Sequence, residues 1–321
     1  GSWGAIILTL LRVCQGIAIG GEWGGAALMA LEHSEKDKRG FSAAFANAGA
    51  PTGTVLGTIA MTVMATLPEH QFLTWGWRVP FFVSGILLIF GLYIRAQIAE
   101  SPLFVAEAER RERNQEGRAP IFAILANPKP VIYVALAGIA AMSVTAMLST
   151  FGITLAVLSG VTRSEALTAF GISQFLAIFT VLFYARLSDR VGRRPVMLAG
   201  VLGLGVVAYP TMLMVSSGHF GTAVAGFVLA LSVCQAACFG PMVAFISEQF
   251  GTSSRYTGAS LGYQLSGLVG AGFAPVIAAS LYAASNSSIS VVAAYLVVVS
   301  LISAVFIVLV RESKDNDLVP G

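Results

Sequence analysis

Long apolar runs separated by short polar segments dominate this chain. Each run is long enough for a helix that crosses a bilayer core, which needs about 20 apolar residues for roughly 30 Å. Backbone polar groups cannot stay unpaired in lipid, and the runs lack the alternation of strands, so they predict helices. The expected fold class is an all-α polytopic membrane protein. The nine runs fall near residues 5–31, 41–66, 79–96, 131–158, 165–187, 195–215, 220–247, 257–284 and 289–310.

Composition excludes a water-soluble protein. Of the 321 residues 56% are hydrophobic and 11% are charged, whereas soluble domains have about 25% charged residues. Mean hydropathy is +0.80. The three cysteines lie in apolar runs, match no disulfide or zinc pattern and are expected to pack; they are Cys14, Cys234 and Cys238.

Metal, nucleotide and enzyme chemistry find little support. No cofactor is expected, because the histidines have no ligand spacing and no phosphate-binding loop is visible. No nucleophile and base pairing indicates an enzyme. The net charge of +3 comes mostly from loop cations, so it does not indicate a nucleic-acid partner.

The cations predict the orientation of the chain. Two arginines, Arg78 and Arg163, fall in loops on one side, and Arg12 falls inside a run. The excess on the other side places the C-terminus in the cytoplasm of a bacterial cell with the protein in its inner membrane, and residue 1 outside. The sixteen cations on the cytoplasmic side are Lys36, Lys38, Arg39, Arg95, Arg110, Arg111, Arg113, Arg118, Lys129, Arg186, Arg190, Arg193, Arg194, Arg255, Arg311 and Lys314.

An internal repeat relates two parts of the chain. Glu32 ends the first run, Arg39 follows seven residues later, and the next run carries Asn47. The same order recurs 216 residues further on, with Glu248, Arg255 and Gln264. A parallel repeat of this length predicts two six-helix halves. Because only three runs precede the central polar segment, three helices of the first half are expected to be absent from this chain.

Several strings carry a family resemblance. They are RVCQGIAIGGEWGGAAL at 12–28, AESPLF at 99–104, ARLSDRVGRR at 185–194 and RYTGASLGYQ at 255–264. They resemble the metabolite:proton symporter branch of the major facilitator superfamily, with the greatest similarity to shikimate-type transporters. Ala185 stands where the loop motif usually has glycine.

The resemblance and the repeat together predict the domain organisation, nine helices of a twelve-helix major facilitator fold. Residues 1–96 are expected to form the second part of the N-terminal transmembrane half. Residues 97–130 are expected to form a cytoplasmic central loop. A C-terminal six-helix half would span 131–311, followed by a cytoplasmic tail at 312–321.

Two charged residues of the first run are the main candidates for a transport site. Arg12 and Glu22 lie roughly 9 Å and 6 Å from the middle of that helix, where an ion is costly unless it meets water or a partner. A guanidinium can hold a carboxylate of an anionic substrate through two hydrogen bonds. Glu22 is expected to carry the coupled proton. The alternatives are an interhelical ion pair for Arg12 and a structural role beside Trp23 for Glu22.

Further residues follow from the family plan and from charge. The plan implies that Gln15, Ser149 and Gln235 line a substrate cavity with Arg12, although each residue alone would suit an interhelical hydrogen bond. The remaining candidates are expected to act as a gate at one end of the helices, or to serve only as topology anchors. These are Asp189, Arg190, Arg193 and Arg194, with Glu248 or Arg255 as partners.

Small residues recur every four positions on three runs. The stripes contain Gly16, Gly20 and Gly24, then Gly49, Gly53 and Gly57, and then Gly258, Gly262, Ser266 and Gly270. Such faces let helices approach closely in a membrane. They predict either static packing or surfaces on which the two halves slide.

Together these features predict a secondary active transporter that couples a small organic acid or related metabolite to protons by alternating access. Its other partners would be membrane lipids, and we expect a functional monomer once the fold is complete. An uncoupled facilitator would not need Glu22. A membrane sensor or scaffold would carry an added signalling domain, for which the ten residues after Arg311 are too short.

Overall fold

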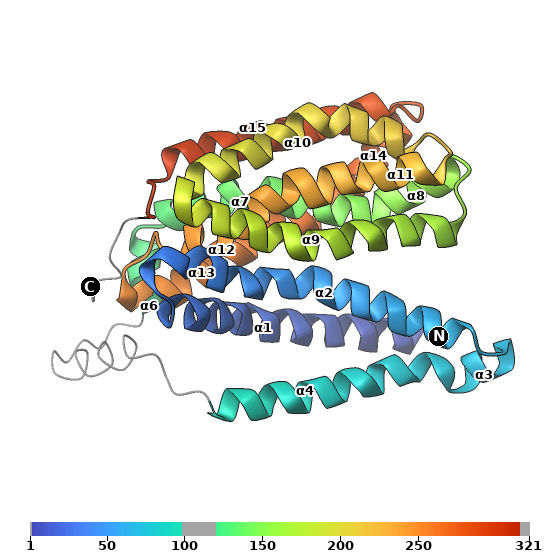
Figure 1. The fold of residues 1–321 in the computed structure, drawn as a ribbon, viewed down its shortest axis with the longest axis horizontal. Helices are drawn as coiled ribbons and strands as arrows, with labels where there is room; N and C mark the ends of the chain where they lie inside the picture. The colour runs from blue at the N-terminus through green and yellow to red at the C-terminus, as the bar shows by residue number, and fades with distance from the viewer. Residues whose placement is uncertain (1, 98–119, 315–321) are drawn as a thin grey trace.

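The computed structural model describes residues 2–97 and 120–314 of the chain. Within these ranges the chain forms helices joined by turns, and no strand is present (Figure 1). Nine of the described helical stretches are long and apolar enough to cross a membrane. The predicted all-α class and the nine spans are therefore confirmed.

The N-terminal part contains three of these spans. They are α1 (Ser2–Glu32), α2 (Arg39–Ala65) and α4 (Val79–Gln97). Short helical turns connect them, namely η1 (Lys36–Lys38), α3 (Glu69–Thr74) and η2 (Gly76–Arg78). In Figure 1 α1 and α2 run side by side, and α4 lies at the edge of the molecule with almost all of its side chains exposed.

The C-terminal part contains six spans, three of which are interrupted by a π-helical segment. The uninterrupted spans are α9 (Arg163–Val191), α10 (Arg193–Val215) and α15 (Ile289–Leu309). The interrupted ones are α7 (Lys129–Met147) with η3 (Leu148–Gly152) and α8 (Ile153–Leu158), α11 (Phe220–Phe227) with η4 (Val228–Gln235) and α12 (Ala236–Ser247), and α13 (Thr252–Ser266) with η5 (Gly267–Gly272) and α14 (Ala274–Ala284).

Local sequence explains two boundaries of α9. At its start, the Thr162 hydroxyl accepts a hydrogen bond from the Glu165 backbone N–H at 3.3 Å, and the Glu165 carboxylate accepts one from the Thr162 N–H at 3.0 Å. This reciprocal capping satisfies two donors that the first turn leaves free. At its end, Gly192 has φ 113°, which glycine adopts without strain, and α10 begins at the next residue.

The core lies mainly in the C-terminal part. α7 packs between α13 and α15, and α10 packs against α15 and α12. Buried apolar side chains from all six of these spans form one cluster. α10 and α12 approach closely at Gly200, where a Cβ atom would lie 2.7 Å from the backbone nitrogen of Cys238.

The N-terminal spans meet this bundle along two lines. α2 packs along α9 and α12, and α1 packs along α13. Ala27, Leu31 and Ala43 are buried in a small cluster with Val243 and Ala244 of α12. These contacts place the end of α1 and the start of α2 beside the boundary between α9 and α10.

The structure changes the expected boundaries around the central segment. Residues 98–119 of the predicted loop lie outside the described residues, and so do 315–321 of the predicted tail. Residues 120–126 form a short helix, α6 (Pro120–Ala126), and α7 begins at Lys129 rather than at 131.

Candidate functional site

The candidate site lies at what we call the charged end, where α1 and α12 end and α2 and α10 begin. Arg193 is at its centre and is fully buried. Its Nη1 lies 2.6 Å from Asp189 Oδ1, and its Nη2 lies 3.2 Å from Glu248 Oε1. The planar guanidinium can serve two carboxylates at once, which a lysine ammonium does less well. One buried cation thus joins α9, α10 and α12.

Asp189 extends this cluster to the N-terminal spans. Its two carboxylate oxygens accept hydrogen bonds from the backbone N–H groups of Gly40, at 2.8 Å, and Phe41, at 2.9 Å. These donors belong to the first turn of α2, where the helix dipole favours a negative charge. A Cβ at Gly40 would lie 2.6 Å from Arg193 Nη1, so only glycine fits the cluster here without displacing it. The carboxylate therefore caps a helix of the other half.

Glu248 is the most enclosed carboxyl group of the cluster, with 1% of its side chain exposed. It accepts a hydrogen bond from the Ser313 hydroxyl at 2.7 Å. Burial raises the pKa of Glu248, while Arg193, Ser313 and Arg39 favour its ionised form. Glu248 consequently takes up a proton more readily than an exposed glutamate does.

A second buried ion pair crosses between the halves. Arg255 Nη1 lies 3.2 Å from Glu32 Oε1, with side chains 3% and 8% exposed. Arg255 also donates from Nε to the carbonyl oxygen of Phe250 at 3.1 Å. Glu32 and Glu248 are repeat equivalents, and so are Arg39 and Arg255. Since Arg39 also favours the charged form of Glu248, the acid of each half faces the cation of the other.

The predicted gate residues thus fall into two groups. Asp189, Arg193, Glu248 and Arg255 take part in the two ion-pair clusters. Arg190 is exposed, and its carbonyl oxygen accepts a hydrogen bond from Lys314 Nζ at 2.7 Å.

Arg194 joins two helices of the C-terminal half instead of the two halves. Its Nε donates to the carbonyl oxygen of Ile307 at 3.2 Å, and its Nη2 donates to that of Val308 at 2.5 Å. Its backbone N–H and that of Arg193 donate to the Glu312 carboxylate, at 2.8 Å and 3.0 Å, which caps α10.

The predicted substrate-binding residues lie on separate elements. Arg12 and Gln15 share an exposed face of α1, where Arg12 Nη1 donates to Gln15 Oε1 at 3.0 Å. Ser149 lies in η3 and donates to the carbonyl oxygen of Ala146, at 3.0 Å. Gln235 is buried at the end of η4. Glu22 belongs to α1, but its side chain lies outside the described ones.

An aromatic contact between the halves is not among the features predicted from the sequence. The rings of Trp23 in α1 and Tyr263 in α13 stack with centroids 3.7 Å apart and an angle of 14°. Trp23 Nε1 donates to Asn47 Oδ1 at 3.4 Å, and Asn47 Nδ2 donates to the carbonyl oxygen of Phe239 at 2.7 Å. The repeated amides, Asn47 and Gln264, were the available signal, because Gln264 Nε2 also reaches the other half, at the carbonyl oxygen of Ile19 (3.4 Å).

Buried ion pairs hold the two halves together at the charged end, and we call this set of contacts the clamp. Buried ion pairs give up hydration on forming, so their net contribution to stability is small compared with the cost of leaving one partner alone. Separation of the halves would return these groups to water together. Among the described residues no group of three His, Cys, Asp or Glu side chains could hold a metal ion.

Comparisons with known proteins agree with this architecture. Residues 134–320 match the family model described as Major Facilitator Superfamily, and residues 1–121 match the one described as Sugar (and other) transporter. The chain is 32% identical to the shikimate transporter of Escherichia coli (strain K12), over 98% of this chain and 72% of that protein. It is 31% identical to the proline/betaine transporter of the same organism, over 99% of this chain and 65% of that protein.

A solved structure shows the same fold. The proton:xylose symporter XylE superimposes with a TM-score of 0.71 over 91% of this chain and 68% of that chain, at 17% identity. The Major Facilitator Superfamily model covers more than half of the chain, and the bacterial relatives named above are transporters. The chain therefore belongs to the major facilitator superfamily of membrane transporters.

Proposed function

We propose that this protein is a secondary active transporter that carries a small organic acid together with protons across a bacterial inner membrane by alternating access. The observation that supports it best is the clamp at the charged end. Two buried ion-pair clusters and the cap from Asp189 to α2 join the halves through side chains and helix ends. Charges held in this way favour one access state while closed and gain hydration when they separate.

In the proposed orientation the charged end faces the cytoplasm. The positive-inside bias of the loops supports this side. The structure would then represent a state whose cytoplasmic end is closed. Asp189, Arg193, Glu248, Arg255 and Glu32 would act as the gate in this scheme.

For the substrate we propose a carboxylate bound by Arg12 with Gln15, and by Ser149 and Gln235 on the C-terminal half. A shikimate transporter among the relatives supports this class of substrate. Glu22 would carry the proton, since a carboxyl group within a membrane-spanning helix is costly to ionise and takes up a proton readily. The proline/betaine transporter among the relatives makes zwitterions the second class to test.

The test is uptake of labelled shikimate, dicarboxylates and betaine by cells that produce the complete gene product carrying this chain. We expect uptake of one carboxylate that a protonophore abolishes. Arg12→Ala should remove uptake while membrane insertion is unchanged. Arg163→Ala is the matched control, because it also removes one exposed arginine, at the start of α9, and should leave uptake unchanged. Uptake that ignores the proton gradient would indicate an uncoupled facilitator instead. Full accumulation by Glu22→Gln would show that another group carries the proton.

A further inference from the structure

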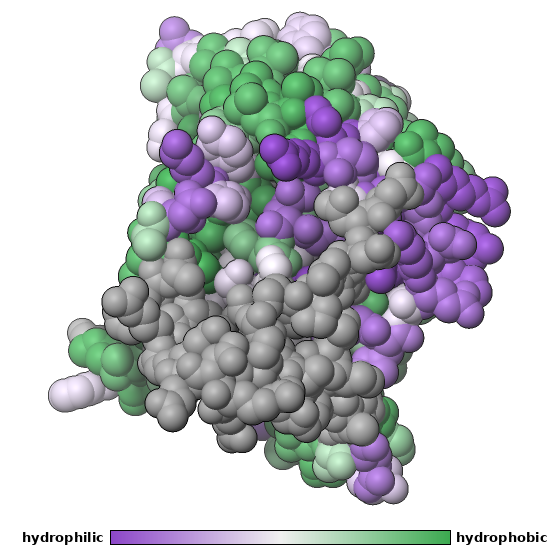
Figure 2. Space-filling view, turned by 90° about the vertical axis from the view of Figure 1, so that its left-hand side faces the viewer, coloured by the Kyte–Doolittle hydropathy of each residue, from purple (hydrophilic) through white to green (hydrophobic). Residues whose placement is uncertain are grey.

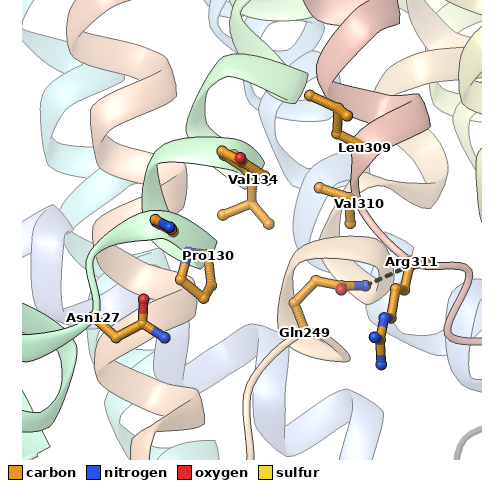
Figure 3. Close-up of a pocket in the computed structure, with 9 residues that line it drawn as sticks. Asn127, Pro130, Val134, Gln249, Leu309, Val310 and Arg311 are labelled. Atoms are coloured by element: carbon orange, nitrogen blue, oxygen red, sulfur yellow. Dashed lines mark hydrogen bonds between the residues drawn. The ribbon is translucent and has the colours of Figure 1, made fainter.

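A cavity of about 240 Å³ lies at the charged end between the start of α7, the end of α15 and the turn after α12. Figure 3 shows Pro130 and Val134 on one wall and Leu309 and Val310 on the facing wall, with Gln249 between them. Gln249 Nε2 donates to the carbonyl oxygen of Arg311 at 3.1 Å, which holds the turn against the end of α15. The cavity is separate from the ion pairs of the clamp.

The lining carries two cations and no carboxylate. Lys129 and Arg311 both line it, and both are exposed. Neither forms an ion pair with another described residue. The nearest acid along the chain, Glu312, is already engaged, because its carboxylate accepts from four backbone N–H groups, those of Arg193, Arg194, Ser313 and Lys314. The cavity therefore lacks an anion that the described protein could provide.

Apolar surface continues from the cavity along the same two helices. Ile132 of α7 is 45% exposed, and Val308 and Leu309 of α15 are 53% and 54% exposed. In a membrane-spanning bundle these side chains face acyl chains. Figure 2 looks onto the charged end, where hydrophilic residues gather, with hydrophobic flanks around it. The two cations of the cavity and the apolar flank thus meet at the depth where lipid headgroups meet lipid tails.

We propose that this cavity binds the phosphate headgroup of an anionic membrane lipid, with the phosphate between Lys129 and Arg311 and the acyl chains along α7 and α15. Phosphate oxygens accept charge-assisted hydrogen bonds from both kinds of cation. Basic pockets between membrane-spanning helices suit such headgroups, since each cation near an anionic surface adds about a fivefold gain in binding. The start of α7 contributes a dipole of the same sign.

Native mass spectrometry of the purified chain in detergent tests this without any transport assay. The chain is titrated with phosphatidylglycerol, and separately with phosphatidylcholine of the same acyl composition. We expect the first lipid to bind at least tenfold more tightly. Lys129→Gln and Arg311→Gln should each weaken phosphatidylglycerol binding by about fivefold, and the double variant by roughly 25-fold. Phosphatidylcholine binding should be unchanged in every variant, which shows that the variants remain folded.

Lys314→Gln is the matched control, because it removes one cation from the same end, three residues from Arg311. It should change phosphatidylglycerol binding by less than twofold. An equal loss in Lys314→Gln and Arg311→Gln would show general attraction to a basic face and would overturn the proposal. Equal binding of the two lipids would overturn it too. Displacement of the lipid by inorganic phosphate at the same concentration would assign the cavity to a soluble anion instead.

Discussion

At the scale of single residues, Asp189 links α2 to the C-terminal half. It accepts two backbone N–H groups of α2 and pairs with Arg193, and it is 8% exposed. Its amide counterpart would keep the shape but lose the charge. The buried guanidinium of Arg193 would then keep only Glu248 as its anionic partner.

Asp189→Asn should lower the free energy of unfolding by on the order of 3 kcal/mol, because it removes one partner of a buried charge pair. Thermal unfolding in detergent measures this loss. Asp37→Asn is the control, since Asp37 is an exposed carboxylate in the adjacent turn and should change stability by less than about 0.5 kcal/mol. Equal effects of the two variants would contradict the assigned role of Asp189.

Glu248 should make closure of the charged end depend on pH. Its pKa in the closed state is raised by burial above the ordinary value of 4.5. Its protonation therefore stabilises closure fully below pH 4.5, and this contribution is lost as the pH rises through the raised pKa. Arg193, Arg39 and Arg255 are the charged groups that act on it.

The measurement is maleimide labelling of Ala43→Cys, a buried position of α2, in a Cys14→Ser background. Each labelling rate is divided by the rate of the denatured protein at the same pH, because the thiolate fraction itself rises with pH. This ratio should increase as the pH rises, and Glu248→Gln should flatten its dependence on pH. Glu35→Gln is the control, because Glu35 is exposed and Lys38 lowers its pKa. A pH dependence that persists unchanged in Glu248→Gln would rule out this carboxyl group as its source.

At the scale of elements, close helix approach is specific to a few glycines. The third predicted stripe packs within its own half, where a Cβ at Gly270 would lie 2.8 Å from the carbonyl oxygen of Ile139. In the first stripe only Gly24 meets the other half, at Ser260, and a Cβ in the second stripe would meet no atom within 4 Å. The structure thus favours static packing for the third stripe, and the sliding role of the others stays a prediction.

Gly240→Ala should destabilise the bundle by about 1–3 kcal/mol, because the added Cβ would meet the carbonyl oxygen of Val181 and lie 3.2 Å from the Ala185 nitrogen. Backbone atoms of α9 cannot move aside as a flexible side chain can. Thermal unfolding in detergent again measures the effect. Gly171→Ala, with no atom within 4 Å of its added Cβ, should be neutral or stabilising by up to about 1 kcal/mol. If both variants behaved alike, close packing at Gly240 would not be the reason.

At the scale of the whole molecule, charges at equivalent positions of the repeat pair across the two halves and keep them in register. The acid of one half meets the cation of the other at Glu32 and Arg255, 223 residues apart in sequence. Because the pair is buried, one charge without the other is costly. The pair therefore reports directly on whether the halves are closed at this end.

Exchange of the two charges tests this pairing. Glu32→Arg and Arg255→Glu should each speed labelling of Ala43→Cys, and the double exchange should recover at least half of the protection, as a coupled pair requires. The exposed pair of Glu35 and Lys38, at 2.6 Å, provides the control exchange, which should have little effect. Purely additive single and double effects would contradict the pairing.

The fold was predictable because every span needs its own apolar run, and nine runs gave nine spans. The gate was predictable only in part. The sequence alone does not distinguish Arg190, Arg193 and Arg194 as gate candidates. Only the direction in which each side chain leaves its helix, on either side of Gly192, places Arg193 in the interior. The repeat pointed to Glu32, but its partner depends on how the halves meet. For the stack of Trp23 on Tyr263, the repeated amides Asn47 and Gln264 were only an indirect signal.

The three π-helical segments give three of the C-terminal spans a property that the described N-terminal helices lack. Each wide turn holds one more residue than the regular ladder of hydrogen bonds requires. Loss of that surplus residue from the turn would rotate the far part of the span by about 100° relative to the near part. Ser149 and Gln235 lie on two of these turns, so a small change of winding would re-aim both side chains while the buried ends of their helices stayed in place.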